Sequence, residues 1–106
     1  MSPLLQVQVI GDTTVAKLVI PNLDDGNAQA VGLELETLAN RPNLDLDLGD
    51  VRYVASMGLA KLVTLHKKVR AAGGRLRLLN VQGVVYDAFR ATMLDKVLDI
   101  RRGTGG

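Results

Sequence analysis

Cysteine and tryptophan are absent from this chain of 106 residues, and histidine occurs once, as His66. Without cysteine the protein has no disulfide and no thiolate metal site, and a single histidine cannot build a zinc site by itself. Aromatic residues are also scarce, with Tyr53, Tyr86 and Phe89 as the whole set. We therefore expect no metal and a core built from aliphatic side chains.

An excess of charge of one sign is missing as well, because 13 basic and 11 acidic residues give a net charge of +2. Proteins that bind nucleic acid carry a stronger basic excess, so we expect no nucleic-acid partner. No segment approaches the roughly 18 apolar residues that a membrane span needs, and residues 1–6 do not resemble a signal peptide. These absences favour a cytoplasmic protein without a membrane span.

Apolar residues make up 47% of the chain, which suits one globular domain over residues 1–106. Alternating apolar and polar residues predict strands, and spacings of three and four predict helices. Gly11-Asp12 joins the first two strands into a hairpin. The expected strands cover 4–10, 15–20, 44–48 and 75–81, and the expected helices cover 28–39, a segment that follows Ser56 and runs to about 72, and 84–92.

The end of the chain is less regular. Residues 94–100 fit either a fifth strand or a last turn, and residues 101–106 are expected to form a frayed, flexible tail beyond a core of about 4–100. Strands that alternate with helices indicate an α/β fold. The sheet should be mixed and mostly parallel, with four or five strands, an N-terminal antiparallel hairpin, and three or four crossover or packing helices.

Apolar stripes identify the buried faces of two of the predicted helices. We expect His66 to be buried and hydrogen-bonded, because it falls on one of these stripes. The stripes comprise Leu59, Leu62, Val63, His66 and Val69 in the second helix, and Val85, Phe89 and Met93 in the third.

Sequence motifs for catalysis are missing, with neither a Gly-rich phosphate loop nor a nucleophile elbow. Ser56 and His66 lie about 15 Å apart along one predicted helix, too far for a nucleophile and its base. Asp24-Asp25 suits a turn, and Asp45 and Asp47 suit the solvent face of a strand. We therefore expect neither an enzyme nor a cofactor.

The most informative segment is residues 46–59, LDLGDVRYVASMGL, which is followed by AAGGRL at 71–76. With Asn80 and ATML at 91–94, it resembles the signature of STAS domains of the anti-sigma factor antagonist family. There, an LDL strand leads through V-x-[FY]-[IV]-D-S-S-G-L into a helix that ends in A-x-G-G-x-L. The resemblance covers about Leu4 to Ile100, nearly the whole chain.

This resemblance implies a bacterial, cytoplasmic signal-transduction protein that regulates transcription through protein–protein interaction. The implied partner is an anti-sigma factor that is also a serine kinase with the ATPase fold of histidine kinases. When the antagonist docks on that partner, the sigma factor is released. The resemblance leaves a homodimer open.

In the family, the partner phosphorylates the serine that immediately precedes the glycine, where the N-terminus of a helix suits a phosphate. The added charge of about −2 then weakens docking. Here that position is Met57, and the family's aspartate position is Ala55, so the phospho-acceptor site is degenerate. Ser56 is either a displaced acceptor or a helix N-cap, and Met57 is either a core residue or an apolar contact for the partner.

Other residues matched by the resemblance keep two interpretations each. Asp24 is either a partner contact or a turn or cap residue, and Lys61 either flanks the interface or lies on a solvated helix face. Gly58 allows either a close approach of the backbone to the partner or a tight turn. The predicted partner-binding residues are Asp24, Ser56, Met57, Gly58, Leu59 and Lys61.

Two other functions remain open for the chain. STAS domains also serve as scaffolds in stress-signalling assemblies and as accessory subunits of lipid ABC transporters, and the missing acceptor at Met57 favours such a role. The third candidate is a small-ligand or nucleotide-binding module or an unrecognised enzyme, although no convergent polar groups mark a pocket.

Overall fold

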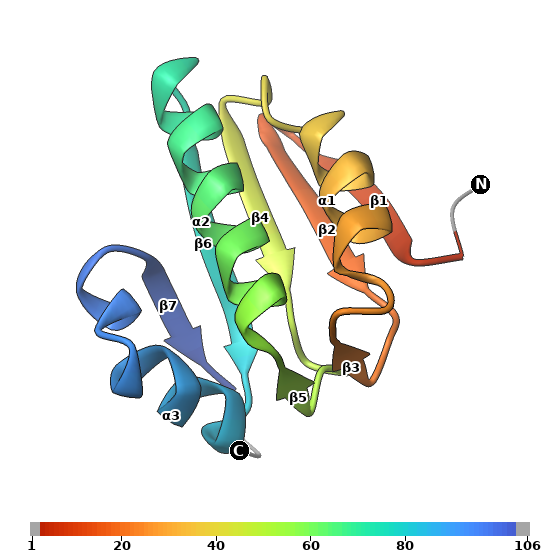
Figure 1. Ribbon diagram of the computed structural model, residues 1–106. Coiled ribbons are helices and arrows are strands. Elements are labelled where there is room, and N and C mark those ends of the chain that lie inside the picture. The colour runs from red at the N-terminus through yellow and green to blue at the C-terminus, as the bar shows by residue number, and fades with distance from the viewer. Residues whose placement is uncertain (1–2, 104–106) are drawn as a thin grey trace.

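Five strands form one sheet in the protein, whose computed structural model describes residues 3–103 (Figure 1). The strands are β1 (Leu5–Ile10), β2 (Thr13–Leu18), β4 (Asn43–Asp47), β6 (Arg75–Val81) and β7 (Asp99–Arg102), in the order β1-β2-β4-β6-β7. The first pair is antiparallel and the other neighbouring pairs are parallel. The predicted mixed, mostly parallel sheet with an N-terminal hairpin is confirmed.

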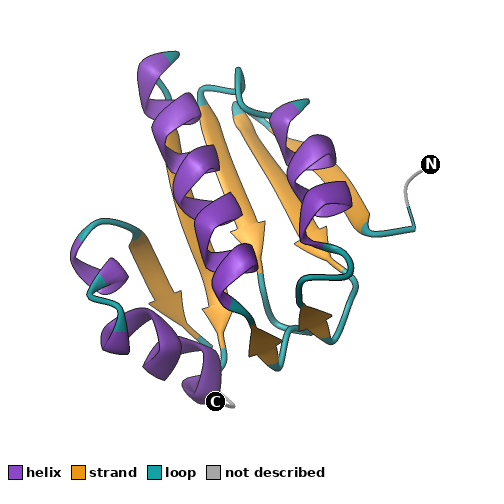
Figure 2. Cartoon of the chain, in the orientation of Figure 1, coloured by secondary structure: helices purple, strands orange, loops and turns teal. Residues whose placement is uncertain are grey.

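Helices connect the parallel strands (Figure 2). They are α1 (Ala28–Glu36), α2 (Ser56–Ala71), α3 (Gly83–Ala91) and a short 3-10 helix, η1 (Leu94–Lys96). Helices α1 and α2 lie side by side over one face of the sheet, and α3 packs against β7. A separate parallel pair of two-residue strands, β3 (Asn22–Leu23) and β5 (Tyr53–Val54), lies near the C-terminal ends of β2 and β4.

Aliphatic side chains fill the space between the sheet and its helices, as the composition required. Leu46 of β4 lies between Ala16 of β2 and Leu78 of β6 in the sheet register, and all three are fully buried. Because strand residues alternate between faces, this row of residues forms the floor of the core. Phe89 of α3 is the largest fully buried side chain.

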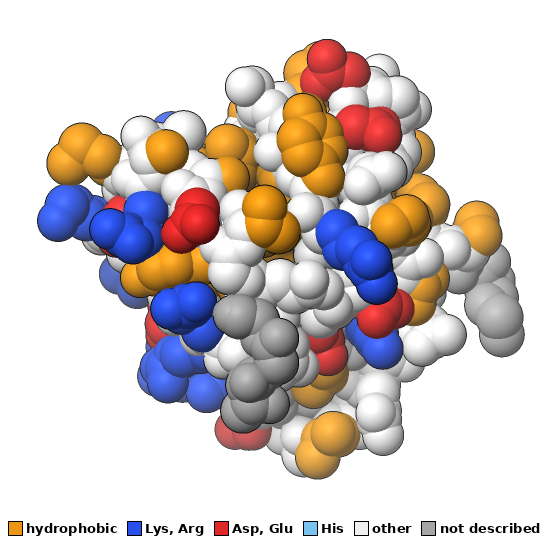
Figure 3. Space-filling model, turned by 90° about the horizontal axis from the view of Figure 1, so that it is seen from below, with side chains coloured by type: hydrophobic (Ala, Val, Ile, Leu, Met, Phe, Trp, Pro, Cys, Tyr) orange, Lys and Arg blue, Asp and Glu red, His pale blue; other side chains and the backbone are white. Residues whose placement is uncertain are grey.

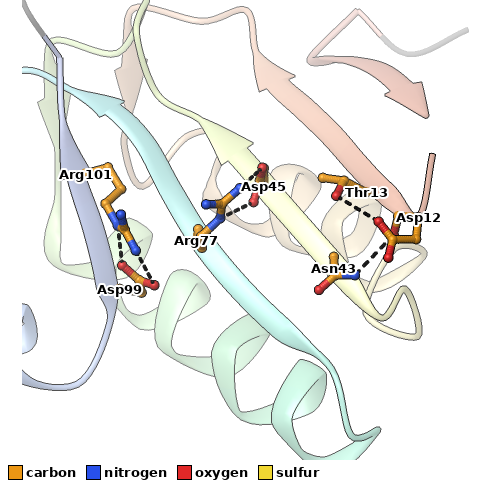
Figure 4. A network of polar contacts seen from close by, with 7 residues as sticks. All are labelled: Asp12, Thr13, Asn43, Asp45, Arg77, Asp99 and Arg101. Carbon is orange, nitrogen blue, oxygen red and sulfur yellow. Dashed lines mark hydrogen bonds and ion pairs between the residues drawn. The ribbon is translucent and has the colours of Figure 1, made fainter. Parts of the chain in front are cut away.

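The face of the sheet opposite α1 and α2 carries polar side chains (Figure 4). Arg77 of β6 lies across from Asp45 of β4 and donates two hydrogen bonds to it, Nε to Oδ1 at 2.8 Å and Nη2 to Oδ2 at 2.6 Å. These bonds, together with the carboxylate charge, raise the pKa of Arg77. Arg77 covers Asp45, which is buried. The prediction that Asp45 faces solvent is therefore wrong.

The buried faces of the helices differ from the predicted stripes at two points. Leu65 is buried in α2, whereas Val63 is only half-buried. Met93 does not join the apolar side of α3, because the helix ends at Ala91. Met93 instead adopts a left-handed backbone with φ 61° and is exposed.

The C-terminal segment is more ordered than predicted. Residues 94–100 contain η1 and the start of β7, so the fifth-strand interpretation is confirmed. Arg101 and Arg102 belong to β7, and their assignment to a frayed tail is wrong because they continue the pairing with β6. Residues 104–106 of the predicted tail lie outside the described residues.

Candidate functional site

Two short strands tie together the loops that precede α1 and α2. In the β3–β5 pair, Asn22 lies opposite Tyr53 and Leu23 lies opposite Val54. The N–H of Ala55 then donates to the carbonyl of Leu23 at 2.8 Å. The sequence did not reveal this pairing, because two residues are too few to show alternation. The pairing fixes the start of α2 relative to the loop before α1.

Gly58 lets α2 approach this strand pair closely. A Cβ at position 58 would lie 2.6 Å from Cγ of Leu23 and 3.0 Å from its carbonyl oxygen. Gly58 thus allows a close approach to the chain's own Leu23, and a close approach of its backbone to a partner stays a prediction. Gly58 and Leu59 are both buried, so they support the site from beneath.

Ser56 is the first residue of α2 and not its N-cap. The carbonyl of Ala55 accepts the first helical hydrogen bond, from the N–H of Leu59 at 3.0 Å, and Ala55 has an extended backbone. The N-cap position of α2 is therefore residue 55, one residue before the serine, and α2 has no side-chain cap. The N-cap interpretation of Ser56 is wrong, and the residue is exposed.

Met57 projects from the first turn of α2 with 49% of its surface exposed, so it is not a core residue. Tyr53 of β5 and Val84 of α3 are 55% and 62% exposed, and α3 packs against β5. Figure 3 looks onto this end of the molecule, where hydrophobic side chains are spread over the surface and basic ones gather toward one side. We call Tyr53, Ser56, Met57 and Val84 the loop-end surface.

Asp24 shapes the loop between β3 and α1. Its Oδ1 accepts a hydrogen bond from the N–H of Gly26 at 2.9 Å, and its carbonyl accepts one from the N–H of Ala28 at 2.8 Å. Its own N–H donates to Oδ1 of Asn27, the N-cap residue of α1, at 3.0 Å. The geometry supports the turn interpretation, and a contact between Asp24 and a partner stays a prediction.

Lys61 packs against α1 in a groove between the two helices. A Cβ on Gly32 would lie 2.9 Å from Cδ of Lys61, so the glycine makes room for the lysine stem. Glu36 and Lys68 form an ion pair that also borders this groove. Lys61 thus covers part of α1 with its methylene groups, as long basic side chains commonly do. Its role at an interface stays a prediction.

Polar side chains anchor the loop that leads from β4 toward the loop-end surface. Gln82 donates from Nε2 to the carbonyl of Gly49 at 2.6 Å. The two oxygens of Asp47 accept hydrogen bonds from the N–H of Gly49 at 2.8 Å and from Nδ2 of Asn80 at 3.2 Å. Sequence reasoning missed Gln82 because nothing in its local pattern marks a contact with a residue so distant in the chain. Both hydrogen bonds of Asp47 are made within the chain, so Asp47 has a structural role in this loop.

His66 departs from its predicted environment. The residue is half-buried, and its Nδ1 atom is buried without a hydrogen-bond partner. Burial lowers the pKa of His66 below its ordinary value, and the charge of Arg70 lowers it further. The predicted hydrogen bond of His66 is absent at Nδ1, so that prediction is wrong for this atom. The lowered pKa favours the neutral ring.

Residues 3–103 contain neither a candidate metal site nor a candidate membrane helix. No group of three histidine or acidic side chains there is placed to hold a metal ion. No helix in the same residues has the length and apolar character to cross a membrane.

Comparison with known proteins matches residues 5–105 to the STAS domain family. The fold is similar to an anti-sigma factor antagonist from Mycobacterium paratuberculosis, with 21% identity, a TM-score of 0.81, and coverage of 92% of this chain and 83% of that one. An anti-sigma-factor antagonist (STAS) domain protein from Planctomyces limnophilus is similar at 18% identity and a TM-score of 0.83, over 92% of this chain and 89% of that one. The murine anion transporter Slc26a9 aligns at 21% identity and a TM-score of 0.64, over 79% of this chain and 14% of the transporter. No curated protein matches the chain.

Proposed function

The chain belongs to the STAS domain family, and from this premise we propose that it is a protein–protein interaction domain that acts as an anti-sigma factor antagonist. Its partner is an anti-sigma factor that is a serine kinase with the ATPase fold of histidine kinases. The chain docks on this partner in the cytoplasm through the loop-end surface and thereby frees the sigma factor. It performs no catalysis itself.

The exposure of Met57 is the observation that carries this proposal. A methionine at the first turn of α2 is half exposed, and α2 contacts the β5 strand that carries the exposed Tyr53 and pairs with β3. Full burial of such a side chain contributes about 1.5–3 kcal/mol, so covering the exposed half of Met57 should stabilise a complex by about 1 kcal/mol. Methionine also adapts its shape to a partner surface.

Docking at this surface should not be switched off by phosphorylation. Position 57 carries no hydroxyl, and Ser56 lies one residue earlier, about 100° around the helix. The hydroxyl of Ser56 therefore points in a different direction from the acceptor that the family uses. We expect no phosphate at Ser56 after incubation with the partner kinase and ATP. A stoichiometric phosphate mapped to Ser56 by mass spectrometry would contradict this.

A second candidate function draws on the same methionine. A STAS domain without an acceptor hydroxyl suits a permanent scaffold in a stress-signalling assembly, or an accessory subunit of a lipid ABC transporter. The neighbouring genes separate these roles, because sigma and anti-sigma genes favour the first proposal, whereas permease and ATPase genes favour the transporter subunit.

The decisive experiment measures binding to an anti-sigma factor kinase from the same organism. Met57→Asp places a charge on the loop-end surface, and we expect at least about a tenfold loss of affinity by calorimetry, or about 1.4 kcal/mol. Val97→Asp is the matched control, because Val97 is 52% exposed and precedes β7 at the N-terminal ends of the parallel strands, whereas the loop-end surface lies near their C-terminal ends. Equal binding by parent and Met57→Asp would exclude this surface as the interface.

A further inference from the structure

The two edges of the five-stranded sheet are chemically different. Strand β7 is four residues long, carries Asp99, Arg101 and Arg102, and has an interrupted register with β6. Short length, charges and irregular pairing keep edge strands from joining other chains. Strand β1 has six residues, LQVQVI, without a charge, a proline or a break in its register. The β1 edge therefore lacks these protective features.

The outer side of β1 offers backbone groups for pairing. The N–H of Val19 donates to the carbonyl of Leu4 at 3.0 Å, and hydrogen-bonded pairs alternate along an antiparallel ladder. Gln8 accordingly bonds toward β2, whereas the N–H and carbonyl groups of Val7 and Val9 point away from the sheet. No strand within residues 3–103 pairs with this side of β1. The side chains of Val7 and Val9 are 49% and 58% exposed.

We propose that two copies of the chain associate through β1, edge to edge and antiparallel, about a twofold axis at Gln8. Val7 of each copy then lies opposite Val9 of the other, and each such pair exchanges two backbone hydrogen bonds. The four valine side chains meet on the helix-bearing side of the sheet, and the two Gln8 amides meet on the other side. The five strands of each copy become one continuous sheet across the dimer.

A second copy is the occupant because β1 complements itself under this symmetry. Valine meets valine and glutamine meets glutamine, so no like charges face each other, whereas a β7 pair would bring arginines together. A single strand edge buries less than the roughly 1,200 Å² typical of stable complexes, which gives a weak, reversible dimer. Association stops at two copies, because β7 is protected and the twofold contact is closed.

Sedimentation velocity of the chain alone tests the dimer over about a hundredfold range of concentration. The parent should shift from monomer to dimer as concentration rises, and amide hydrogen exchange at Val7 and Val9 should slow in parallel. The double variant Val7→Lys/Val9→Lys should stay monomeric at every concentration. Both sites are exposed, so its melting temperature should fall by no more than about 4–8 °C.

A matched control places two lysines on other exposed apolar residues, Leu33 and Val97. Leu33→Lys/Val97→Lys should dimerise like the parent. A parent that stays monomeric, a β1 double variant that dimerises equally well, or growth of the parent into larger fibres would each overturn the proposal. These outcomes involve no anti-sigma factor, so they leave the proposed function untouched.

Discussion

Residues 53–59 supply most of the loop-end surface and most of the layer beneath it, and these two sets of residues differ in burial. Tyr53, Ser56 and Met57 are exposed, whereas Val54 and Gly58 are buried among them. The buried residues form a supporting layer, which comprises Leu23, Val54, Gly58 and Leu59. Changes in the supporting layer should alter folding stability, and changes on the loop-end surface should alter partner binding alone.

The largest expected effect comes from Gly58→Val. The added side chain would overlap the carbonyl and side chain of Leu23, neither of which can move without breaking the β3–β5 pair. Overpacking of this kind should lower the free energy of unfolding by about 3 kcal/mol, as measured by urea denaturation. The same substitution at exposed Ala60, on the same helix, should cost less than about 1 kcal/mol. Similar losses of unfolding free energy at both positions would contradict a close approach of α2 to Leu23 at Gly58.

An intermediate effect is expected from Gln82→Ala, which releases the loop before β5. Loss of the Nε2 hydrogen bond to the carbonyl of Gly49 should lower stability by about 1 kcal/mol. Because this loop leads into the loop-end surface, partner affinity should fall as well. Gln29→Ala, at an exposed residue of α1, is the control and should change neither quantity. Reduced stability with unchanged affinity would show that the loop's anchor does not matter for docking.

The folding stability of the protein should depend on pH through His66. Burial lowers the pKa of His66 in the folded state, so the unfolded chain takes up a proton first as pH falls. The free energy of unfolding should therefore decline below about pH 6.5 and be unaffected by this group well above it. His66→Gln should flatten the change in urea midpoint between about pH 7.5 and 5.5. An unchanged pH profile in this variant would contradict the shift.

The smallest effect on stability, below about 0.5 kcal/mol, is expected from Met57→Ser, because the site is exposed. This change restores the acceptor at the position that the family uses, and the partner kinase should add one phosphate there, detectable by mass spectrometry. Ala60→Ser, one turn further along α2, should remain unmodified. Absence of phosphate on Met57→Ser would argue against a kinase partner.

Local sequence patterns predicted most of the fold. The strand over residues 75–81 is observed as predicted, and α2 ends at Ala71, one residue before its expected end at about 72 and two before Gly73. These elements are long enough for periodicity to be read, and glycine marks where they stop. The exposure of Val7 and Val9 was not predictable, because alternation shows which residues share a face but not whether anything covers it.

The candidate site stays a prediction, and the sequence did not indicate which of its residues are exposed. The resemblance located residues 56–59, yet only the fold shows that Met57 is exposed while Gly58 and Leu59 are buried. The β3–β5 pair and the Gln82 contact depend on residues about 30 positions apart, which no local pattern encodes.

Docking on the loop-end surface is tested most directly by backbone amide chemical shifts. The shifts of the isotope-labelled protein are recorded while the anti-sigma kinase is added. We expect the largest changes at Tyr53, Ser56 and Met57, and little change at Asp45 and Arg77 on the far face of the sheet. Changes centred on Asp45 and Arg77, with the Met57 signal unmoved, would contradict it.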